Sequence, residues 1–290
     1  MENIFIVGCG YIGSRVSRLE RLEGSRVAAM VRSESSVDLL EQEGIKVFMG
    51  DLDDAASLNG LPLEKALVYY FAPPPSEGVV DLRMDRFLSS IDPSSLPGRV
   101  VLISTTGVYG NCGGDWVTEG RPAAPEADRA KRRLSAETIL RSWGEANSIP
   151  VIMLRVPGIY GPGKLPEKRL REGLPVLREE DSPFSNRVHA DDLARACVAA
   201  ARRGEGGGIY NISDGHPTTM TNYFYKVADH LGLPRPPAIS LDEARRQLSA
   251  GMLSYLAESK RLDNRKMREE LGVEPLYPDL DSGLPSCLYK

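Results

Sequence analysis

The stretch Ile4-Phe5-Ile6-Val7-Gly8-Cys9-Gly10-Tyr11-Ile12-Gly13 decides the fold of this chain. Its apolar run predicts a buried parallel strand, and the G-x-G-x-x-G that follows predicts a tight turn into a helix. Gly8 allows the turn, Gly10 lets the backbone approach a pyrophosphate, and Gly13 lets helix and strand pack closely. Phosphate oxygens then meet unpaired N–H groups at the positive end of the helix. The residues predicted to bind a dinucleotide here are Gly8, Gly10, Tyr11, Ile12 and Gly13; the alternative is an ordinary glycine-rich turn.

The composition is that of a globular protein with an ordinary core. The 290 residues accommodate one large α/β domain, or one domain with a small appendage. The net charge of −4 gives no field that attracts nucleic acid or an anionic membrane, so neither is an expected partner. No apolar run is long enough to span a bilayer and no signal peptide precedes Ile4, so we expect a cytoplasmic protein.

Four cysteines are scattered along the chain, at Cys9, Cys112, Cys197 and Cys287. They form no C-x-x-C and have no histidine at ligand spacing, so we predict neither a disulfide nor a metal site. Cys9 and Cys197 lie in apolar segments and are expected to be small buried side chains.

The second predicted strand, residues 26–31, ends in Val31 and Arg32. A site selective for NAD places an acidic residue near this point to hold the ribose 2′-hydroxyl. A carboxylate repels a 2′-phosphate, whereas a guanidinium binds it bidentately. Arg32 therefore favours NADP as the cofactor over NAD. The alternative is that Arg32 is a solvated loop residue.

Two further segments follow strands at the same predicted sheet edge. Gly50-Asp51-Leu52-Asp53 follows a strand at 46–49, and Asp51 is in position to accept a hydrogen bond from an adenine amino group. The alternative for Asp51 is to N-cap a short helix near Ala55. Ala72-Pro73-Pro74-Pro75 follows a strand at 66–71 and forms a stiff wall where open α/β sheets place ligands. Asp51, Leu52, Ala72 and Pro73 are thus predicted cofactor contacts.

The fifth predicted strand, residues 99–104, leads into Ser104-Thr105-Thr106-Gly107-Val108-Tyr109-Gly110. A hydroxyl at this strand end is placed to meet a substrate oxygen. Thr105 is the candidate for that contact, and a purely structural hydroxyl that closes the strand end is the alternative.

In these motifs the chain resembles the extended short-chain dehydrogenases/reductases, the NAD(P)-dependent sugar-nucleotide epimerase/dehydratase superfamily. The resemblance covers roughly residues 3 to 275 and rests on the glycine turn, Asp51-Leu52, residues 104–110, the Arg155–Gly163 loop, Val188-His189-Ala190-Asp191-Asp192-Leu193-Ala194, and Tyr210-Asn211-Ile212. It implies a nicotinamide dinucleotide cofactor with Pro157 beside the nicotinamide. It also raises a homodimer as an option, through the helices after strands four and five.

One departure from the family concerns its catalytic pair, a Tyr and a Lys four residues later on the helix after strand five. Alignment on Glu137 puts Arg129 at the Tyr position and Arg133 at the Lys position, and no Tyr occurs between Tyr109 and Tyr160. Because an arginine does not give up its proton, the usual relay is missing and the chain resembles an atypical branch. The resemblance implies that Arg133 binds the nicotinamide ribose and that Arg129 holds an anionic or carbonyl group of the substrate. The alternative is two surface arginines.

Strands at 151–154 and 209–212 complete the predicted fold, a doubly wound α/β Rossmann domain with a seven-stranded, mainly parallel sheet. We assign residues 1–155 plus 187–213 to the NAD(P)-binding domain. Residues 156–186 plus 214–290 form a small, mostly helical substrate domain, with helices expected at 241–252 and 260–271. His189 is expected to make a structural turn and N-cap, with a catalytic histidine as the alternative.

Two functional hypotheses follow from these residues. In the first, the protein is an NADP-dependent oxidoreductase, epimerase or dehydratase acting on a polar small molecule, with a nucleotide-linked one among the options. Its catalytic residues are then Thr105, Arg129 and Arg133. In the second, it is a non-catalytic NADP-binding sensor or regulatory protein of the same fold. The intact cofactor motif supports both hypotheses. The missing Tyr–Lys pair favours the second, whereas the polar segment 164–186, expected to form part of a substrate lid, and the retained Thr105 favour the first, which we prefer.

Overall fold

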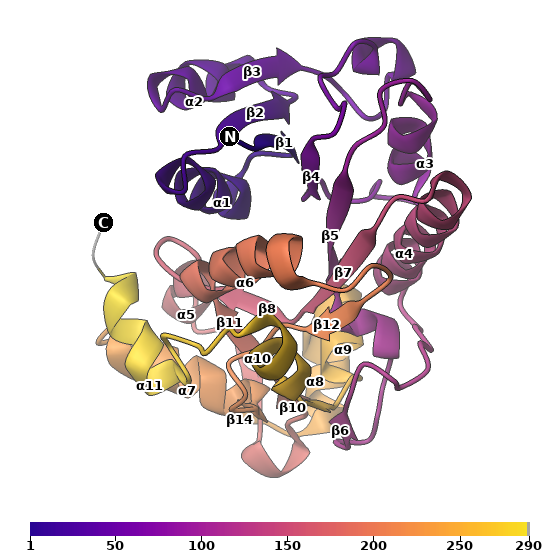
Figure 1. The fold of residues 1–290 in the computed structure, drawn as a ribbon. Helices are drawn as coiled ribbons and strands as arrows, with labels where there is room; N and C mark the ends of the chain where they lie inside the picture. Colours follow the sequence, from indigo (N-terminus) through magenta and orange to yellow (C-terminus); the bar gives the residue numbers. More distant parts are fainter. Residues whose placement is uncertain (289–290) are drawn as a thin grey trace.

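The fold is organised around seven strands, described by a computed structural model that covers residues 1–288. In chain order they are β1 (Asn3–Val7), β2 (Arg26–Val31), β3 (Lys46–Met49), β4 (Leu67–Tyr70), β5 (Arg99–Thr105), β7 (Val151–Val156) and β12 (Ile209–Asn211). They pair in the order β12-β7-β5-β4-β1-β2-β3, and every pair is parallel. The predicted doubly wound sheet is confirmed, and it is parallel throughout (Figure 1).

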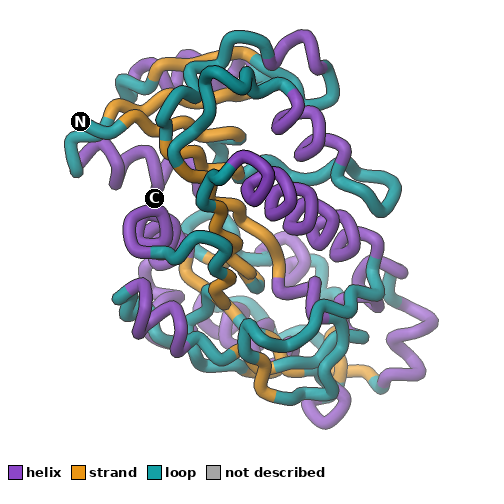
Figure 2. The backbone as a smooth tube through the Cα atoms, turned by 45° about the vertical axis from the view of Figure 1, so that its right-hand side comes forward, coloured by secondary structure: helices purple, strands orange, loops and turns teal. Residues whose placement is uncertain are grey.

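Both faces of the sheet are covered, because its strands are apolar on both sides. Along β1, Ile4 and Ile6 pack with Val16 of α1 (Tyr11–Leu22) and Cys197 of α6 (Ala190–Arg203). Phe5 faces the other way, toward α3 (Leu82–Ser89) and α4 (Asp128–Asn147). The strands therefore run through the middle of the molecule with helices on either side (Figure 2). α2 (Val37–Gln42) joins the first of these layers through Leu40.

The remaining elements come from the segments predicted as a substrate domain, together with one loop before α4. They include α5 (Glu167–Arg171), α7 (Met220–His230), α8 (Leu241–Gln247), α9 (Ala250–Leu256), α10 (Arg265–Leu271) and α11 (Leu280–Gly283). Short strands pair as β8 (Gly158–Tyr160) with β11 (Arg187–His189), β9 (Val176–Leu177) with β14 (Ala238–Ile239), β10 (Phe184–Ser185) with β13 (Thr218–Thr219), and β6 (Trp116–Val117) with β15 (Arg261–Leu262). The division into two domains stays a prediction.

Two predicted helices differ from the observed ones. The helix expected at 241–252 is two helices, because the Ser249 side chain accepts a hydrogen bond from Met252 N and starts a second helix. The helix expected from residue 260 begins only at Arg265, since residues 261–262 are paired as β15. Leu262, Met267 and Leu271 of this segment are all buried.

No helix within residues 1–288 is long and apolar enough to cross a membrane.

Candidate nucleotide and substrate site

The glycine turn between β1 and α1 has the geometry that a pyrophosphate site requires. Gly8 has a φ of +90°, and a Cβ built on it would lie 2.9 Å from Ala72 N. A Cβ on Gly13 would lie 3.0 Å from the Gly8 carbonyl oxygen, so Gly13 lets α1 pack against the turn. At Gly10 the same construction meets no atom of the described residues within 4 Å. The approach to the first N–H groups of α1 is therefore open, which fits a bound diphosphate.

A cavity of about 230 Å³ adjoins this turn at the carboxyl edge of the sheet. Six residues predicted to contact the cofactor line it, namely Gly8, Arg32, Asp51, Leu52, Ala72 and Pro73. The others in its wall are Met30, Val31, Gly50 and Arg83. Gly10, Tyr11, Ile12 and Gly13 do not line this cavity and lie at the start of α1 beside it. The cavity suits the adenosine half of a dinucleotide.

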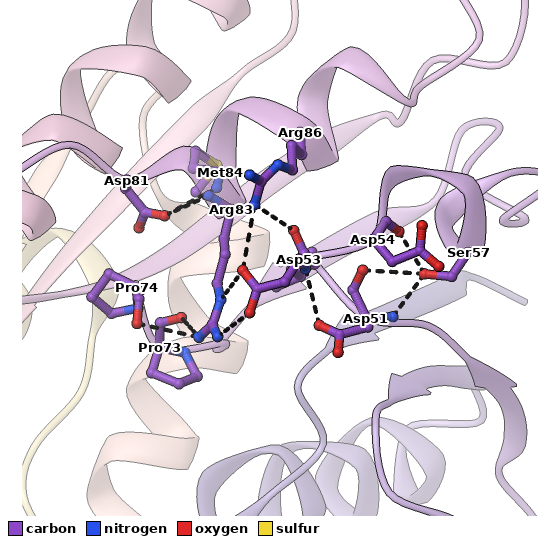
Figure 3. Close-up of polar contacts among 11 residues, drawn as sticks. Asp51, Asp53, Asp54, Ser57, Pro73, Pro74, Asp81, Arg83, Met84 and Arg86 are labelled. Carbon is purple, nitrogen blue, oxygen red and sulfur yellow. Dashed lines mark hydrogen bonds and ion pairs between the residues drawn. The ribbon is translucent and has the colours of Figure 1, made fainter. Parts of the chain in front are cut away.

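Arg83, near the start of α3, is a cavity residue that the sequence analysis missed. Its guanidinium donates to Asp53 through Nε at 3.0 Å and Nη2 at 2.5 Å, and through Nη1 to Pro73 O at 3.2 Å and Pro74 O at 3.3 Å. It thus bridges the loops that follow β3 and β4, as Figure 3 shows. The hydrogen bonds from Arg83 are the main reason that the pKa of Asp53 is lowered. An arginine in the first turn of the helix after the proline wall was the available signal.

Asp51 does not cap the short helix Ala55–Leu58. That N-cap is Asp54, whose Oδ1 accepts from Ala56 N at 3.1 Å. Asp51 Oδ1 instead accepts from Asp53 N at 2.9 Å, and the residue lines the cavity. The N-cap alternative for Asp51 is therefore wrong, because the helix begins one turn later than that alternative requires (Figure 3).

A second cavity, of about 520 Å³, lies where α4 and the ends of β5 and β7 meet the C-terminal elements. It brings together Thr105, Arg129, Arg133 and Pro157, all predicted site residues. Other polar and aromatic residues of its wall include Asn186, Arg187, Tyr223, Tyr255, Glu258 and Lys260. The predicted catalytic residues thus share one cavity, separate from the adenosine-sized one.

Thr105 and the two arginines each have definite contacts. Thr105 Oγ1 accepts from Gly107 N at 3.2 Å, which closes the strand end, while its side chain also lines the cavity. Arg129 donates to Ser254 Oγ at 2.6 Å, and its guanidinium lies 3.8 Å from the Tyr255 ring centre. Arg133 donates to Ala72 O at 3.2 Å, and burial lowers the pKa of its guanidinium. Neither arginine is a solvated surface side chain.

A buried polar network holds α4 against the sheet beneath this cavity. Glu137 is fully buried and accepts from Ser104 Oγ at 2.5 Å and from Arg155 Nη2 at 2.7 Å. The Arg155 guanidinium lies over the Tyr109 ring, whose hydroxyl donates to Asn211 Oδ1 at 2.7 Å. The network joins α4 to β5, β7 and β12, so it fixes the helix that carries Arg129 and Arg133.

His189 is a structural residue despite a triad-like arrangement with Ser286 and Asp191. Its Nδ1 accepts from Asp191 N at 3.2 Å and caps α6, while Nε2 lies 3.0 Å from Ser286 Oγ. Because Nδ1 is the acceptor, the ring proton is assigned to Nε2, which donates to Ser286 and cannot take its proton. Burial also lowers the pKa of His189. The geometry matches the expected turn and N-cap.

The cysteines are free thiols, and Cys9 and Cys197 are buried as expected. Burial raises the pKa of Cys9 to about 12, so it is an unreactive thiol at neutral pH. Within residues 1–288, no group of three His, Cys, Asp or Glu side chains is arranged to hold a metal ion.

Comparisons with known proteins agree with this geometry. The pattern of the NAD dependent epimerase/dehydratase family matches residues 82–213, and that of the TrkA-N domain matches residues 4–72. Protein YeeZ of Escherichia coli strain K12 is 27% identical over 289 residues, covering 96% of this chain and 97% of that protein.

Solved structures of similar fold cover almost the whole chain. A functionally unknown conserved protein from Silicibacter pomeroyi DSS is 26% identical, with a TM-score of 0.80 over 98% of this chain and 97% of its own. A dTDP-glucose 4,6-dehydratase from Bacillus anthracis in complex with NAD is 20% identical, with a TM-score of 0.79 over 99% of this chain and 95% of its own.

Proposed function

We propose that this chain, which carries an NAD-dependent epimerase/dehydratase family domain over residues 82–213, is an NADP-binding enzyme acting on a polar small molecule without the usual Tyr–Lys relay. One observation supports this most directly. Ala72 and Pro73 line the adenosine-sized cavity, Pro74 lines the larger one, and Arg133 donates from the larger one to Ala72 O. The two cavities thus flank one proline wall, as the two halves of a dinucleotide site would.

The residues present fit a nicotinamide dinucleotide. The open turn at Gly10 would hold the diphosphate, Asp51 and Leu52 would contact the adenine, and Pro157 and Arg133 would hold the nicotinamide half. Arg32 is an exposed guanidinium in the wall of the adenosine cavity, which favours a 2′-phosphate and therefore NADP. When bound, the cofactor supplies a nicotinamide ring that accepts or returns a hydride.

The chain's own residues then orient the substrate and handle its proton. Thr105 hydrogen-bonds the substrate oxygen, and Arg133 stabilises negative charge that develops on it. Arg129 and Arg133 keep their protons, so neither is the acid. We assign the proton to Tyr255, a phenol in the cavity wall whose ring centre lies 3.8 Å from Arg129 Cζ, because a phenol hydroxyl can give up and take back a proton whereas an arginine does not.

A second candidate is the non-catalytic sensor, and the position of Arg129 favours it. Arg129 is engaged with Ser254 and Glu258 instead of presenting a free group to a substrate. In a sensor, the conformation of the protein and not a reaction reports whether the cofactor is bound. An arginine that ties residues 254–258 to α4 would couple these two segments in such a protein.

Calorimetric titration with NADP⁺ and NAD⁺ tests the cofactor assignment. We expect the wild type to prefer NADP⁺ and Arg32→Asp to lose that preference; unchanged selectivity would overturn it. A screen of sugar nucleotides and small carbonyls, followed by nicotinamide absorbance and by product analysis, separates enzyme from sensor. Turnover that Tyr255→Phe slows supports the assigned proton donor. Tight cofactor binding with no turnover in any class favours the sensor.

A further inference from the structure

Arg187 is a buried cation with no carboxylate partner in the wall of the larger cavity. Its residue is only 8% exposed. Nη1 donates to Ser185 Oγ at 2.5 Å and to Asn186 O at 2.8 Å, Nη2 lies 3.2 Å from Met220 Sδ, and the guanidinium stacks 4.0 Å from the Tyr223 ring centre. All of these partners are neutral. Within the described part of the chain, no acidic oxygen lies within 4.0 Å of it.

Two of the other cations of this cavity, Arg129 and Lys260, share a carboxylate, whereas Arg133 donates to the Ala72 carbonyl oxygen. Glu258 pairs with Lys260 at 2.7 Å and with Arg129 at 3.5 Å. Near Arg187 the buried acid is Asp214, whose backbone N–H donates to Arg187 O at 2.9 Å. Burial raises the pKa of Asp214 to about 7, so near neutral pH it carries only part of a negative charge. A buried charge without a full counter-charge is costly, and a bound anion would remove that cost.

The backbone opposite Arg187 is shaped to admit its guanidinium. Gly158 on β8 is the register partner of Arg187 on β11. A Cβ on Gly158 would lie 2.7 Å from Arg187 Nη1 and 3.1 Å from its Cζ. Both residues line the cavity, next to Pro157. Any side chain at position 158 would therefore displace the guanidinium from the cavity wall.

From this geometry we infer that Arg187 and Gly158 form an oxyanion subsite, and that the substrate carries a carboxylate or phosphate group which Arg187 binds. This rests on the proposed function for its placement in a substrate cavity, and it adds the chemical class of the substrate. The planar guanidinium recognises either group by paired N–H donors. The subsite lies beside Pro157, so the anionic group binds near the reacting end of the cavity.

Calorimetric titration with two probes, malonate for carboxylates and inorganic pyrophosphate for phosphoryl groups, tests the subsite. Each is titrated into wild type, Arg187→Met, Gly158→Ala and the exposed control Arg171→Met, with and without saturating NADP⁺. At least one probe should bind the wild type. A charge-assisted hydrogen bond is worth about 1.5–3 kcal/mol, so Arg187→Met should weaken that probe about tenfold or more. Gly158→Ala should weaken it similarly, and Arg171→Met should leave it unchanged.

The outcomes separate this inference from the cofactor proposal. The probe that depends on Arg187 identifies the group as carboxylate or phosphate. If neither probe binds the wild type, or if Arg187→Met and Gly158→Ala bind as tightly as the wild type, the subsite does not exist. Should Arg187→Met fail to fold, Gly158→Ala carries the same expectation. A protein that ignores NADP⁺ but still shows Arg187-dependent anion binding refutes the cofactor assignment alone.

Discussion

Glu137 Oε2 lies 2.7 Å from Arg155 Nη2, and both side chains are buried between α4 and the sheet. The carboxylate accepts a second bond from Arg155 Nε at 3.1 Å, so the pair is bidentate. Ser104, immediately before Thr105, donates to the same carboxylate. One ion pair therefore sets the position of α4, and with it the two arginines of the larger cavity.

Removing Arg155 alone should lower the stability of the protein more than removing both Arg155 and Glu137. Arg155→Met leaves Glu137 buried without its cation, and we expect the free energy of unfolding to fall by about 3–5 kcal/mol. The double variant Glu137→Leu/Arg155→Met should recover much of that loss, because no uncompensated charge remains. Urea denaturation followed by circular dichroism measures both. A double variant less stable than Arg155→Met would contradict the argument.

Arg129 should act as a clasp between α4 and the segment around α9. Helix α9 has no buried residue of its own, and Arg129 holds it through Ser254, Tyr255 and Glu258. In Arg129→Met we expect hydrogen exchange to accelerate several-fold in the α9 amides, since local opening there costs less. Lys131→Met is the control, because the ion pair that Lys131 makes among residues 1–288 is with Asp128 on its own helix. Exchange that is unchanged in α9 would refute the clasp.

The bridge between Asp53 and Arg83 should influence cofactor choice. Asp53→Asn leaves one oxygen to accept from Arg83 and removes a negative charge that lies within the field of Arg32. In the wild type, the Asp53 carboxylate repels the 2′-phosphate that Arg32 is proposed to bind. Loss of this repulsion should raise the preference for NADP⁺ over NAD⁺ by about threefold, the effect of a charge several ångströms away in water. Arg83→Met should weaken both cofactors, because it disconnects the loops after β3 and β4. Calorimetry with both dinucleotides measures these affinities. An unchanged ratio of NADP⁺ to NAD⁺ affinity in Asp53→Asn would contradict an influence of Asp53 on cofactor choice.

Local sequence patterns predicted the structural features that depend on residues adjacent in the chain. They missed the contacts that depend on residues far apart in the sequence. The turn at Gly8 and the burial of β1 follow from short motifs, and both are as expected. Ser249 breaks a helix that periodicity alone joined, because a cap competes with propensity. Arg83 and Arg187 were missed because their meaning comes from partners across the fold: Asp53 lies 30 residues from Arg83, and Tyr223 and Gly158 lie on other elements. No pattern within one segment carries that information.

Asp214 should make stability depend on pH in a defined direction. Burial, opposed in part by the hydrogen bond from His216 N, raises its pKa from an ordinary 3.8 to about 7 in the folded protein. The folded state then binds the proton more tightly, so its contribution to stability is complete below about pH 4 and is lost as pH rises through 7. Asp214→Asn keeps an Oδ1 acceptor and does not ionise. Relative to the wild type it should gain stability as pH rises from 5 to 7, by at most about 1.4 kcal/mol per pH unit. Denaturation of both proteins at each pH measures this, and a constant difference would show that Asp214 does not titrate there.

Gly8 and Gly10 should respond differently to the same substitution. In Gly8→Ala the new methyl meets Ala72 N at 2.9 Å, on a residue whose φ of +90° is strained for alanine. We therefore expect a loss of at least about 1–3 kcal/mol of stability together with lost nucleotide binding. In Gly10→Ala the methyl enters a space with no atom of residues 1–288 within 4 Å. Stability should stay close to that of the wild type while binding of NADP⁺ is lost, because the methyl occupies the room needed by the diphosphate. Thermal unfolding and calorimetric titration of the two variants provide the comparison. Full NADP⁺ affinity in a stable Gly10→Ala protein would mean that the diphosphate does not lie on this turn.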